Sequence, residues 1–300
     1  MQACAETPKI MPRDTFAVIG GSGAQEIIRA DAQCFKRLGP APTPFGLSAP
    51  LYRVRMNEAH FLFMPRHGDT GEELAAPWVN YRASIYALKE QGASRIMAWS
   101  APAAVNVALT VGQYVLPHDL VDDTRGRESS FFKGTGLGGL RQRPVFCDEM
   151  RAAAESVLRM LSIKYQPHGT YVCAQGPRLE TPAEVKRLRS WGGDMVGMTL
   201  APEAFLAREL EMCYLPLCCI GRYGEGIRER EGKPGRVLEE VQEQAEREAL
   251  AQSLGFMLEI VARVSRAVPD EPRCACAQAM EQYRKEGRIG DDWHTWIGRP

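Results

Sequence analysis

The chain has 300 residues, of which 45% are hydrophobic and 25% charged, as in an ordinary globular protein. Its 37 Lys and Arg balance its 37 Asp and Glu, so the formal net charge is zero, which argues against a nucleic-acid or membrane-surface partner. No apolar run approaches the roughly 18 residues of a membrane span, and the first residues lack the pattern of a signal peptide. We therefore expect a cytoplasmic protein.

Apolar strands alternate with helices along the chain. Strand-like segments are predicted at 15–20, 51–56 and 60–64 (these two as a hairpin), 112–121, 194–199 and 213–221. The segments 95–103 and 168–180 are each predicted to start as a strand and run into a loop. Helices are predicted at 79–92, 151–165, 181–193, 202–210 and 235–265, the third with Thr181 as N-cap. Residues 122–148, rich in Gly and Arg, indicate a long loop. This alternation favours an α/β fold: a single domain with a central mixed β-sheet flanked by helices.

Three parts are expected along the chain: an N-terminal extension (1–14), one α/β domain (15–265) and a polar C-terminal tail (266–300). No repeat or internal linker divides the domain. The tail ends in aromatic residues that include Trp293 and Trp296. We expect it to be a loosely held extension; the alternative is that its aromatic end docks on the body or on a neighbour.

The nine cysteines are expected to be reduced thiols packed as small hydrophobic residues. Their number is odd, and several lie in apolar stretches such as CYLPLCCIG (213–221). Cys274 and Cys276 come closest to a metal motif, but one residue separates them rather than two. No second pair lies at zinc-finger distance. The sequence therefore predicts no metal site.

Four short blocks carry residues suited to ligand chemistry. GGSG (20–23) and PRHG (65–68) each follow a predicted strand, where backbone N–H groups, a hydroxyl and an arginine suit an oxyanion, with the histidine as a second donor. GPRLETPAE (176–184) is a rigid loop whose carboxylate could accept from a ligand N–H. VGMT (196–199) suits the face of a sugar or ring. Taken singly, GGSG is equally well explained as a tight turn, and PRHG and VGMT are better explained as surface or capping residues and as core packing.

In this order, however, the blocks resemble the purine nucleoside phosphorylase family, in particular its trimeric methylthioadenosine phosphorylase branch. The matching segments, between about residues 15 and 260, are VIGGSG, PRHG, VNYRASIYALKEQGA, SFFKG, GPRLETPAE, WGGDMVGMT and APEAFLARE. The resemblance implies phosphorolysis: phosphate attacks the anomeric carbon of a purine nucleoside or a 5′-methylthio relative, and the purine leaves. It also implies a homotrimer, and inorganic phosphate as co-substrate with no cofactor.

The resemblance assigns residues to the phosphate and the sugar. The family's phosphate contacts carry over onto Ser22, Arg66, His67, Ser100, the backbone of Ala101, and Thr199. The sugar contact carries over onto Met198. Pro234 stands where the family contacts the 5′-group, and an apolar residue there suits a methylthio group better than a hydroxyl.

The residues expected at the base depart from the family pattern. Arg222 replaces an acidic or amide residue, and Leu179 replaces an aromatic that stacks near the base. Ala103 stands in place of a loop glycine, and would be strained if that position needs a positive φ.

These departures favour a 6-oxopurine. Arg222 offers only donors, which suit O6 and N7 of such a base. Glu180 can accept from its N1–H, as the matching carboxylate does in the 6-oxopurine branch, and Gly197 also matches that branch. We therefore expect Arg222 and Glu180 to be catalytic and the substrate to be shifted towards 6-oxopurine nucleosides.

Two other functions stay open. In the first, Arg222 pairs with Glu180 and closes the base pocket, and the chain is a catalytically impaired homologue that binds a nucleoside or assembles with partners. In the second, less favoured because Arg66 and His67 are retained, the chain is a nucleosidase that uses water.

Overall fold

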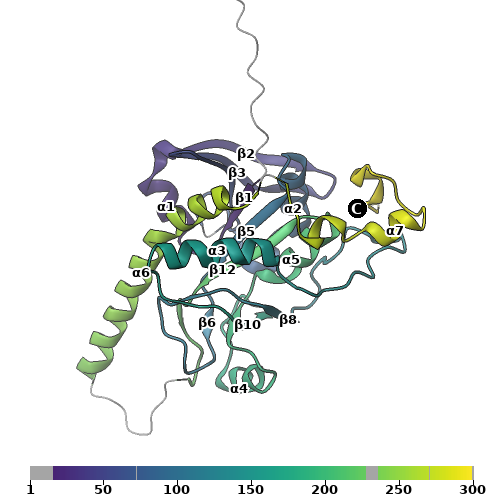
Figure 1. Cartoon of the computed structure of the whole chain (residues 1–300). Coiled ribbons are helices and arrows are strands. Elements are labelled where there is room, and N and C mark those ends of the chain that lie inside the picture. Colours follow the sequence, from purple (N-terminus) through teal and green to yellow (C-terminus); the bar gives the residue numbers. More distant parts are fainter. Residues whose placement is uncertain (1–15, 72, 228–235, 270, 299–300) are drawn as a thin grey trace, which may run out of the picture.

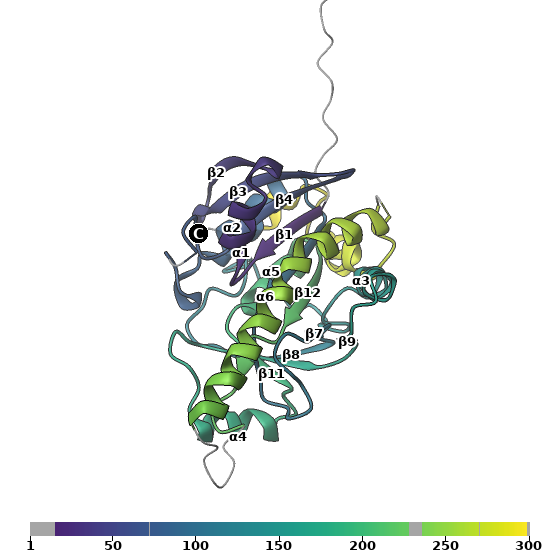
Figure 2. The same cartoon turned by 90° about the vertical axis from the view of Figure 1, so that its left-hand side faces the viewer.

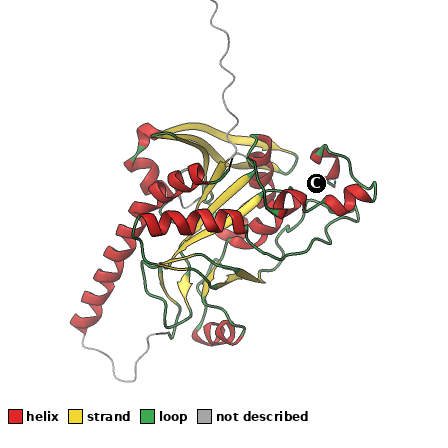
Figure 3. Ribbon diagram, in the orientation of Figure 1, coloured by secondary structure: helices red, strands yellow, loops and turns green. Residues whose placement is uncertain are grey.

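The computed structural model describes residues 16–71, 73–227, 236–269 and 271–298. Its strands form two mixed sheets between helices (Figures 1 and 3). The larger sheet has the order β2 (Phe35–Thr43), β3 (Gly46–Met56), β4 (Ala59–Pro65), β1 (Phe16–Gly20), β5 (Arg95–Ser100), β12 (Cys213–Cys219), β7 (Tyr114–Val115), β9 (Tyr165–Gln166). The smaller has the order β13 (Arg222–Tyr223), β6 (Ala103–Ala104), β11 (Met195–Gly197), β10 (Thr170–Ala174), β8 (Asp119–Asp123). The expected mixed α/β fold is confirmed, with the strands divided over two sheets.

The centre of the larger sheet is parallel. Strands β4, β1, β5 and β12 run in the same direction, and their side chains are almost entirely buried. This is why each reads as a continuous apolar run rather than an alternating one, since a parallel strand is covered on both faces. The carboxyl ends of these strands consequently meet at one edge of the sheet.

The helices surround this sheet. They are α1 (Ala24–Ala30), α2 (Tyr81–Glu90), α3 (Asp148–Met160), α4 (Pro182–Ser190), α5 (Leu200–Glu209), α6 (Arg236–Ala267) and α7 (Glu281–Lys285), with 3₁₀ turns η1 (Ala32–Cys34), η2 (Ala76–Trp78), η3 (Ala275–Gln278) and η4 (Trp293–Trp296). Helix α3 packs on α6, and α2 packs on α5; Figure 2 shows α6 running diagonally across the body. In the part of the chain that is described, no helix has the length and apolar character needed to cross a bilayer.

Two predicted elements have different boundaries in the structure. The segment 112–121 is not one strand but parts of β7 and β8, which belong to different sheets, with Pro117 between them. Proline lacks the N–H that would continue a ladder. The helix predicted at 151–165 begins at Asp148 and ends at Met160, and the left-handed backbone of Ser162 (φ 54°) stops its continuation.

The capping box predicted at Thr181 is confirmed. Its hydroxyl accepts from the backbone N–H of Glu184 at 3.3 Å, and the Glu184 carboxylate accepts from the backbone N–H of Thr181 at 2.8 Å. This fixes the start of α4 and with it the direction of the preceding loop, which carries Glu180.

The expectation of a loosely held tail is wrong for the residues described there. Cys276, Met280 and Trp296 are buried. The Arg284 guanidinium forms an ion pair with Glu211 and lies 5.0 Å from the Trp296 ring centroid. These contacts dock the tail, yellow in Figure 1, on the main body. The alternative expected from the sequence, that the aromatic end of the tail docks on the body, is the one that the structure confirms.

The buried carboxylate of Glu209 holds the long loop in place through two hydrogen bonds to residues 130 and 131. Glu209 accepts from the backbone N–H of Phe131 at 2.7 Å and from the Ser130 hydroxyl at 2.8 Å. Burial raises the pKa of Glu209 to about 7, although both hydrogen bonds act in the opposite direction.

This pKa predicts a pH-dependent stability. Between the ordinary carboxyl value and about 7, the folded chain keeps a proton that the unfolded chain releases, so the free energy of unfolding falls as pH rises through that window. We expect Glu209→Gln to remove about 3 kcal/mol of this fall. Urea denaturation between about pH 5 and about pH 8 measures it; equal slopes in wild type and variant would contradict the assignment.

Candidate active site

A cavity of about 240 Å³ lies at the carboxyl ends of the parallel strands. Residues that follow β1, β4 and β5 in the larger sheet meet residues of the smaller sheet there. The lining comprises Gly21, Ser22, Arg66, His67, Ala76, Ser100, Ala101, Ala103, Leu179, Glu180, Val196, Gly197, Met198, Thr199 and Arg222. Every site residue expected from the sequence is among them except Pro234, which lies outside the described residues.

Arg66 forms the floor of the cavity with a fully buried ion pair. Its Nε and Nη2 donate to the Glu203 carboxylate at 2.8 and 2.9 Å, and each side chain is 2% exposed. Burial alone would disfavour the charge, but the charge and hydrogen bonds of Glu203 outweigh it and raise the pKa of Arg66. The remaining guanidinium nitrogen, Nη1, lies beside Gly21, where an added Cβ would be 3.1 Å away.

A third buried group completes this cluster. The Tyr214 hydroxyl, from β12, donates to Glu203 at 2.5 Å. Burial, and then the charge of Glu203, raise the pKa of Tyr214 well above its ordinary value, so it remains a hydrogen-bond donor. Glu203 lies in the matching segment APEAFLARE, but the sequence assigned no role to it or to Tyr214, because these roles appear only when both side chains meet beside Arg66 in the fold.

His67 is held as a neutral ring. Its Nδ1 lies 2.7 Å from the carbonyl oxygen of Leu74, and because a carbonyl only accepts, Nδ1 carries the proton. Burial and the neighbouring Arg66 charge lower the pKa of His67. Its Nε2 is therefore an acceptor, which differs from the donor role expected from the sequence.

Two hydroxyls in the cavity wall, of Ser100 and Thr199, differ in their hydrogen bonding. The Ser100 hydroxyl lies 3.2 Å from the Tyr171 hydroxyl. The Thr199 hydroxyl is buried and has no hydrogen-bond partner among the described residues. Because buried polar groups are rarely left unpaired, Thr199 marks a place for a ligand oxygen.

The side chain of Tyr171 leaves room only for a glycine at position 197. A Cβ at this position would lie 1.8 Å from the Tyr171 hydroxyl, closer than any real contact. No larger residue fits unless Tyr171 moves, so this part of the cavity is shaped by a glycine and a fully buried tyrosine together.

Glu180 and Arg222 form the expected pair. The Arg222 Nη2 lies 3.2 Å from a Glu180 oxygen, and Nη1 donates to the Tyr223 carbonyl at 3.1 Å. Glu180 is 6% exposed and Arg222 is 35% exposed. Both still line the open cavity, so the pair forms without closing it.

The strain expected at Ala103 is absent. This residue lies in β6 and pairs with Val196 of β11 and with Arg222 of β13, and it is not among the described residues with positive φ. The loss of the family's glycine is therefore accommodated as ordinary extended backbone.

Arg127, from the long loop, is a further residue that sequence reasoning missed. Its guanidinium donates to the carbonyls of Met198 at 2.7 Å, Ala201 at 2.8 Å and Gln175 at 2.7 Å. It therefore ties together two loops that supply the cavity wall.

The comparisons with known proteins agree with this fold and cavity. Residues 15–261 match the model of the phosphorylase superfamily. A 6-oxopurine nucleoside phosphorylase of Pyrococcus furiosus is 34% identical over 90% of this chain and 98% of its own length. A probable S-methyl-5′-thioinosine phosphorylase of Methanothermobacter thermautotrophicus is 33% identical over 88% of each chain. The solved methylthioadenosine phosphorylase from Schistosoma mansoni, 24% identical, shares the fold with a TM-score of 0.76 over 91% of this chain and 98% of its own.

Fold and cavity thus define an α/β protein with a polar pocket at the ends of parallel strands. The chain belongs to the phosphorylase superfamily, and the resemblance predicted from its motifs is confirmed.

The Arg66–Glu203 pair predicts a large effect on stability. We expect Glu203→Gln to lower the free energy of unfolding by about 3–5 kcal/mol, because it leaves the Arg66 charge buried without its partner. Glu259→Gln, which breaks the exposed 2.7 Å pair with Arg263 on α6, should change it by about 1 kcal/mol or less. Urea denaturation of both compares them, and equal effects would contradict the role given to Glu203.

Proposed function

We propose that the chain catalyses phosphorolysis of a 6-oxopurine nucleoside or its 5′-methylthio relative, giving the free base and ribose 1-phosphate or its methylthio analogue. One observation carries the proposal: a single cavity combines the buried Arg66 and the unpartnered Thr199 hydroxyl with the buried Glu180 carboxylate, which pairs with the partly exposed Arg222. The named activities of the two relatives above support the substrate class.

The phosphate binds beside the buried Arg66 and the unpartnered Thr199 hydroxyl. The Ser22, Ser100 and Thr199 hydroxyls and the Ala101 backbone N–H donate to its oxygens, and the charge of Arg66 favours an anion. His67 accepts through Nε2 from a protonated phosphate oxygen. This binding aims one phosphate oxygen at the anomeric carbon of the sugar, whose face rests on Met198.

The base binds beside the Glu180–Arg222 pair. Glu180 accepts from N1–H, and Arg222 donates to O6 or N7, beside Leu179 and Gly197. As the bond from the anomeric carbon to the base breaks, its electron pair leaves with the purine, while the phosphate oxygen forms the new bond. Arg222 stabilises the purine anion through hydrogen bonding, since its own proton is too tightly held to be transferred, and the proton comes from solvent.

Several further properties belong to the same proposal. Residues 15–265 form the catalytic domain, Pro234 contacts the 5′-group, and the enzyme is a cytoplasmic homotrimer of purine salvage that needs no cofactor. These rest on the family resemblance. Against an impaired homologue stands the open cavity, which the Arg222–Glu180 pair leaves accessible. Against a nucleosidase stand the retained Arg66 and His67.

The reaction itself is tested by chromatography of the free base. Inosine, guanosine, adenosine, methylthioinosine and methylthioadenosine are incubated with the enzyme, with and without phosphate. We expect phosphate-dependent release, fastest from the 6-oxopurine nucleosides. Release without phosphate would identify a nucleosidase, and no release by the folded protein would identify the impaired homologue.

Thr199 gives effects of opposite sign on stability and binding. Thr199→Val removes a buried hydroxyl that has no partner, so the ligand-free protein should keep or gain stability, while KM for phosphate rises about tenfold. Thr199→Ser retains the hydroxyl and should leave KM within about twofold of wild type. Steady-state kinetics and thermal unfolding measure the two effects; an unchanged KM in the valine variant would remove Thr199 from the phosphate site.

Glu180 controls the choice of base. Glu180→Gln replaces a charged acceptor by a neutral amide, so kcat/KM for inosine should fall by about 10- to 100-fold. The amide can both donate and accept, so adenosine, which lacks N1–H, should lose much less. A matched pair of kinetic measurements gives the ratio, and an equal loss for both substrates would contradict contact between Glu180 and N1.

A further inference from the structure

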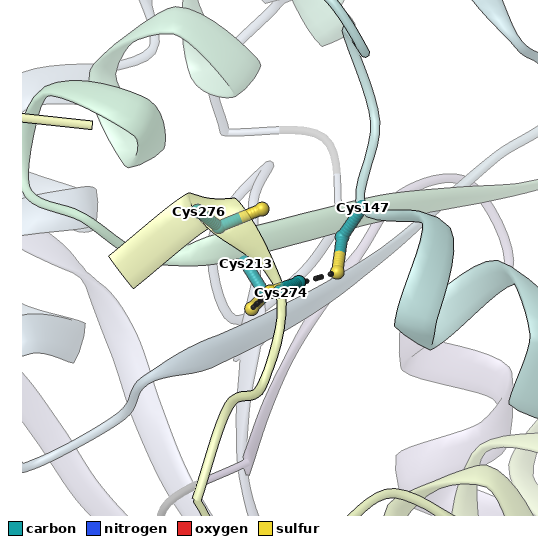
Figure 4. Close-up of side chains that lie close together, drawn as sticks. All are labelled: Cys147, Cys213, Cys274 and Cys276. Carbon is teal, nitrogen blue, oxygen red and sulfur yellow. Dashed lines mark hydrogen bonds between the residues drawn. The ribbon is translucent and has the colours of Figure 1, made fainter. Parts of the chain in front are cut away.

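Four cysteine thiols meet where the tail crosses the main body (Figure 4). Cys147 is the N-cap residue of α3 and Cys213 begins β12, while Cys274 and Cys276 lie at the start of η3. All four are free thiols, and their sulfurs lie within 4.8 Å of one another. The Cys274 Sγ is 3.3 Å from that of Cys213 and 3.6 Å from that of Cys147.

These distances fit a single tetrahedral metal ion, and in structural sites with four cysteine ligands that ion is commonly Zn²⁺. Four thiolates about 2.3 Å from a tetrahedral Zn²⁺ stand about 3.8 Å from one another. A disulfide would bring two sulfurs to about 2 Å. In an iron–sulfur cluster the thiolates bind different irons and so stand farther apart than they do around a single ion.

We propose that Cys147, Cys213, Cys274 and Cys276 bind one Zn²⁺ as a structural tetrathiolate site, which fastens the C-terminal tail to α3 and β12. This goes beyond the proposed function and does not depend on it. The sequence concealed the site because Cys213 and Cys147 precede Cys274 by 61 and 127 residues, so no zinc-finger spacing exists. The expectation of no metal site considered only pairs close in sequence.

The surroundings favour thiolates over thiols. Cys147 lies at the positive end of α3, which stabilises a negative sulfur. The buried Arg95 stands beside Cys213 in the parallel register of β5 and β12, and Lys89 interacts electrostatically with Cys213. Arg95 also pairs with Glu149 at 3.4 Å, so the helix end and these side chains offset only part of the excess negative charge of four thiolates around Zn²⁺. Binding displaces the thiol protons to solvent.

The site lies far from the cavity. Cys213 begins β12, whereas the cavity lies at the carboxyl ends of the strands parallel to it, roughly 20 Å along a seven-residue strand. The metal consequently has no part in phosphorolysis. Its effect is on the tail, whose docking also uses the Arg284–Glu211 pair and the buried Trp296.

The first experiment is the metal content of the full chain, purified without a chelator or a metal-affinity column. Mass spectrometry of the elements should find one zinc per chain in wild type. The double variant C274S/C276S should lose it, while C34S, which removes a partly exposed thiol outside the cluster, should keep it. Zinc absent from wild type that fails to rebind after reduction, or zinc retained by the double variant, would overturn the proposal.

The second experiment uses wild type alone, so that a folding defect in the variant cannot decide the matter. Reduced, zinc-free chain titrated with Co²⁺ should develop the charge-transfer and visible bands of a tetrahedral thiolate site, saturating at one ion per chain and reversed by Zn²⁺. Removal of zinc should also make the tail more sensitive to limited proteolysis. A Cys213–Cys274 disulfide in the native chain, iron in place of zinc, or no cobalt spectrum would each overturn the assignment.

Discussion

The ion pair between Arg66 and Glu203 holds the site together. Arg66 follows β4, Glu203 belongs to α5, and the Tyr214 hydroxyl on β12 joins them at the same carboxylate. Taking two charges out of water is costly. The attraction offsets this cost because two nitrogens of Arg66 bind the Glu203 carboxylate and the Tyr214 hydroxyl donates a third hydrogen bond to it. A helix, a loop and a strand are thereby fixed around one carboxylate, that of Glu203.

As a consequence, the guanidinium of Arg66 is held in one orientation in the wall of the cavity. Two nitrogens of Arg66 are committed to Glu203, so the guanidinium cannot reorient, and its third nitrogen faces the glycine turn after β1. Arg127 acts similarly on the loops of the cavity wall by donating to four backbone carbonyls. Groups whose positions are fixed before the ligand arrives lose less entropy on binding, which is the physical basis of preorganised phosphate sites.

The sequence predicted the strands and helices of this arrangement better than the contacts between distant segments. Apolar runs identified the buried strands, and Thr181 identified the start of α4, because local composition determines both. It could not identify Glu203, Tyr214 or Arg127, whose roles arise only when distant segments meet. Ala103 illustrates the reverse error: a missing glycine suggests strain only if the backbone is left-handed, and pairing in β6 makes it extended. The four clustered cysteines were overlooked for the same reason as Glu203, since sequence separation conceals their proximity.

The Arg222–Glu180 pair decides whether the base pocket is usable. Had both side chains been buried, separating them would cost several kcal/mol and the pocket would be closed in practice. Arg222 is instead a third exposed, so water can take over its hydrogen bonds when it turns away from Glu180. Glu180, by contrast, is almost completely buried, so its carboxylate needs a donor in every state. In the proposed function, a base with an N1–H supplies that donor as Arg222 turns towards the acceptors of the same base. On that proposal the Arg222–Glu180 pair is a resting state that a 6-oxopurine replaces, and it does not close the pocket.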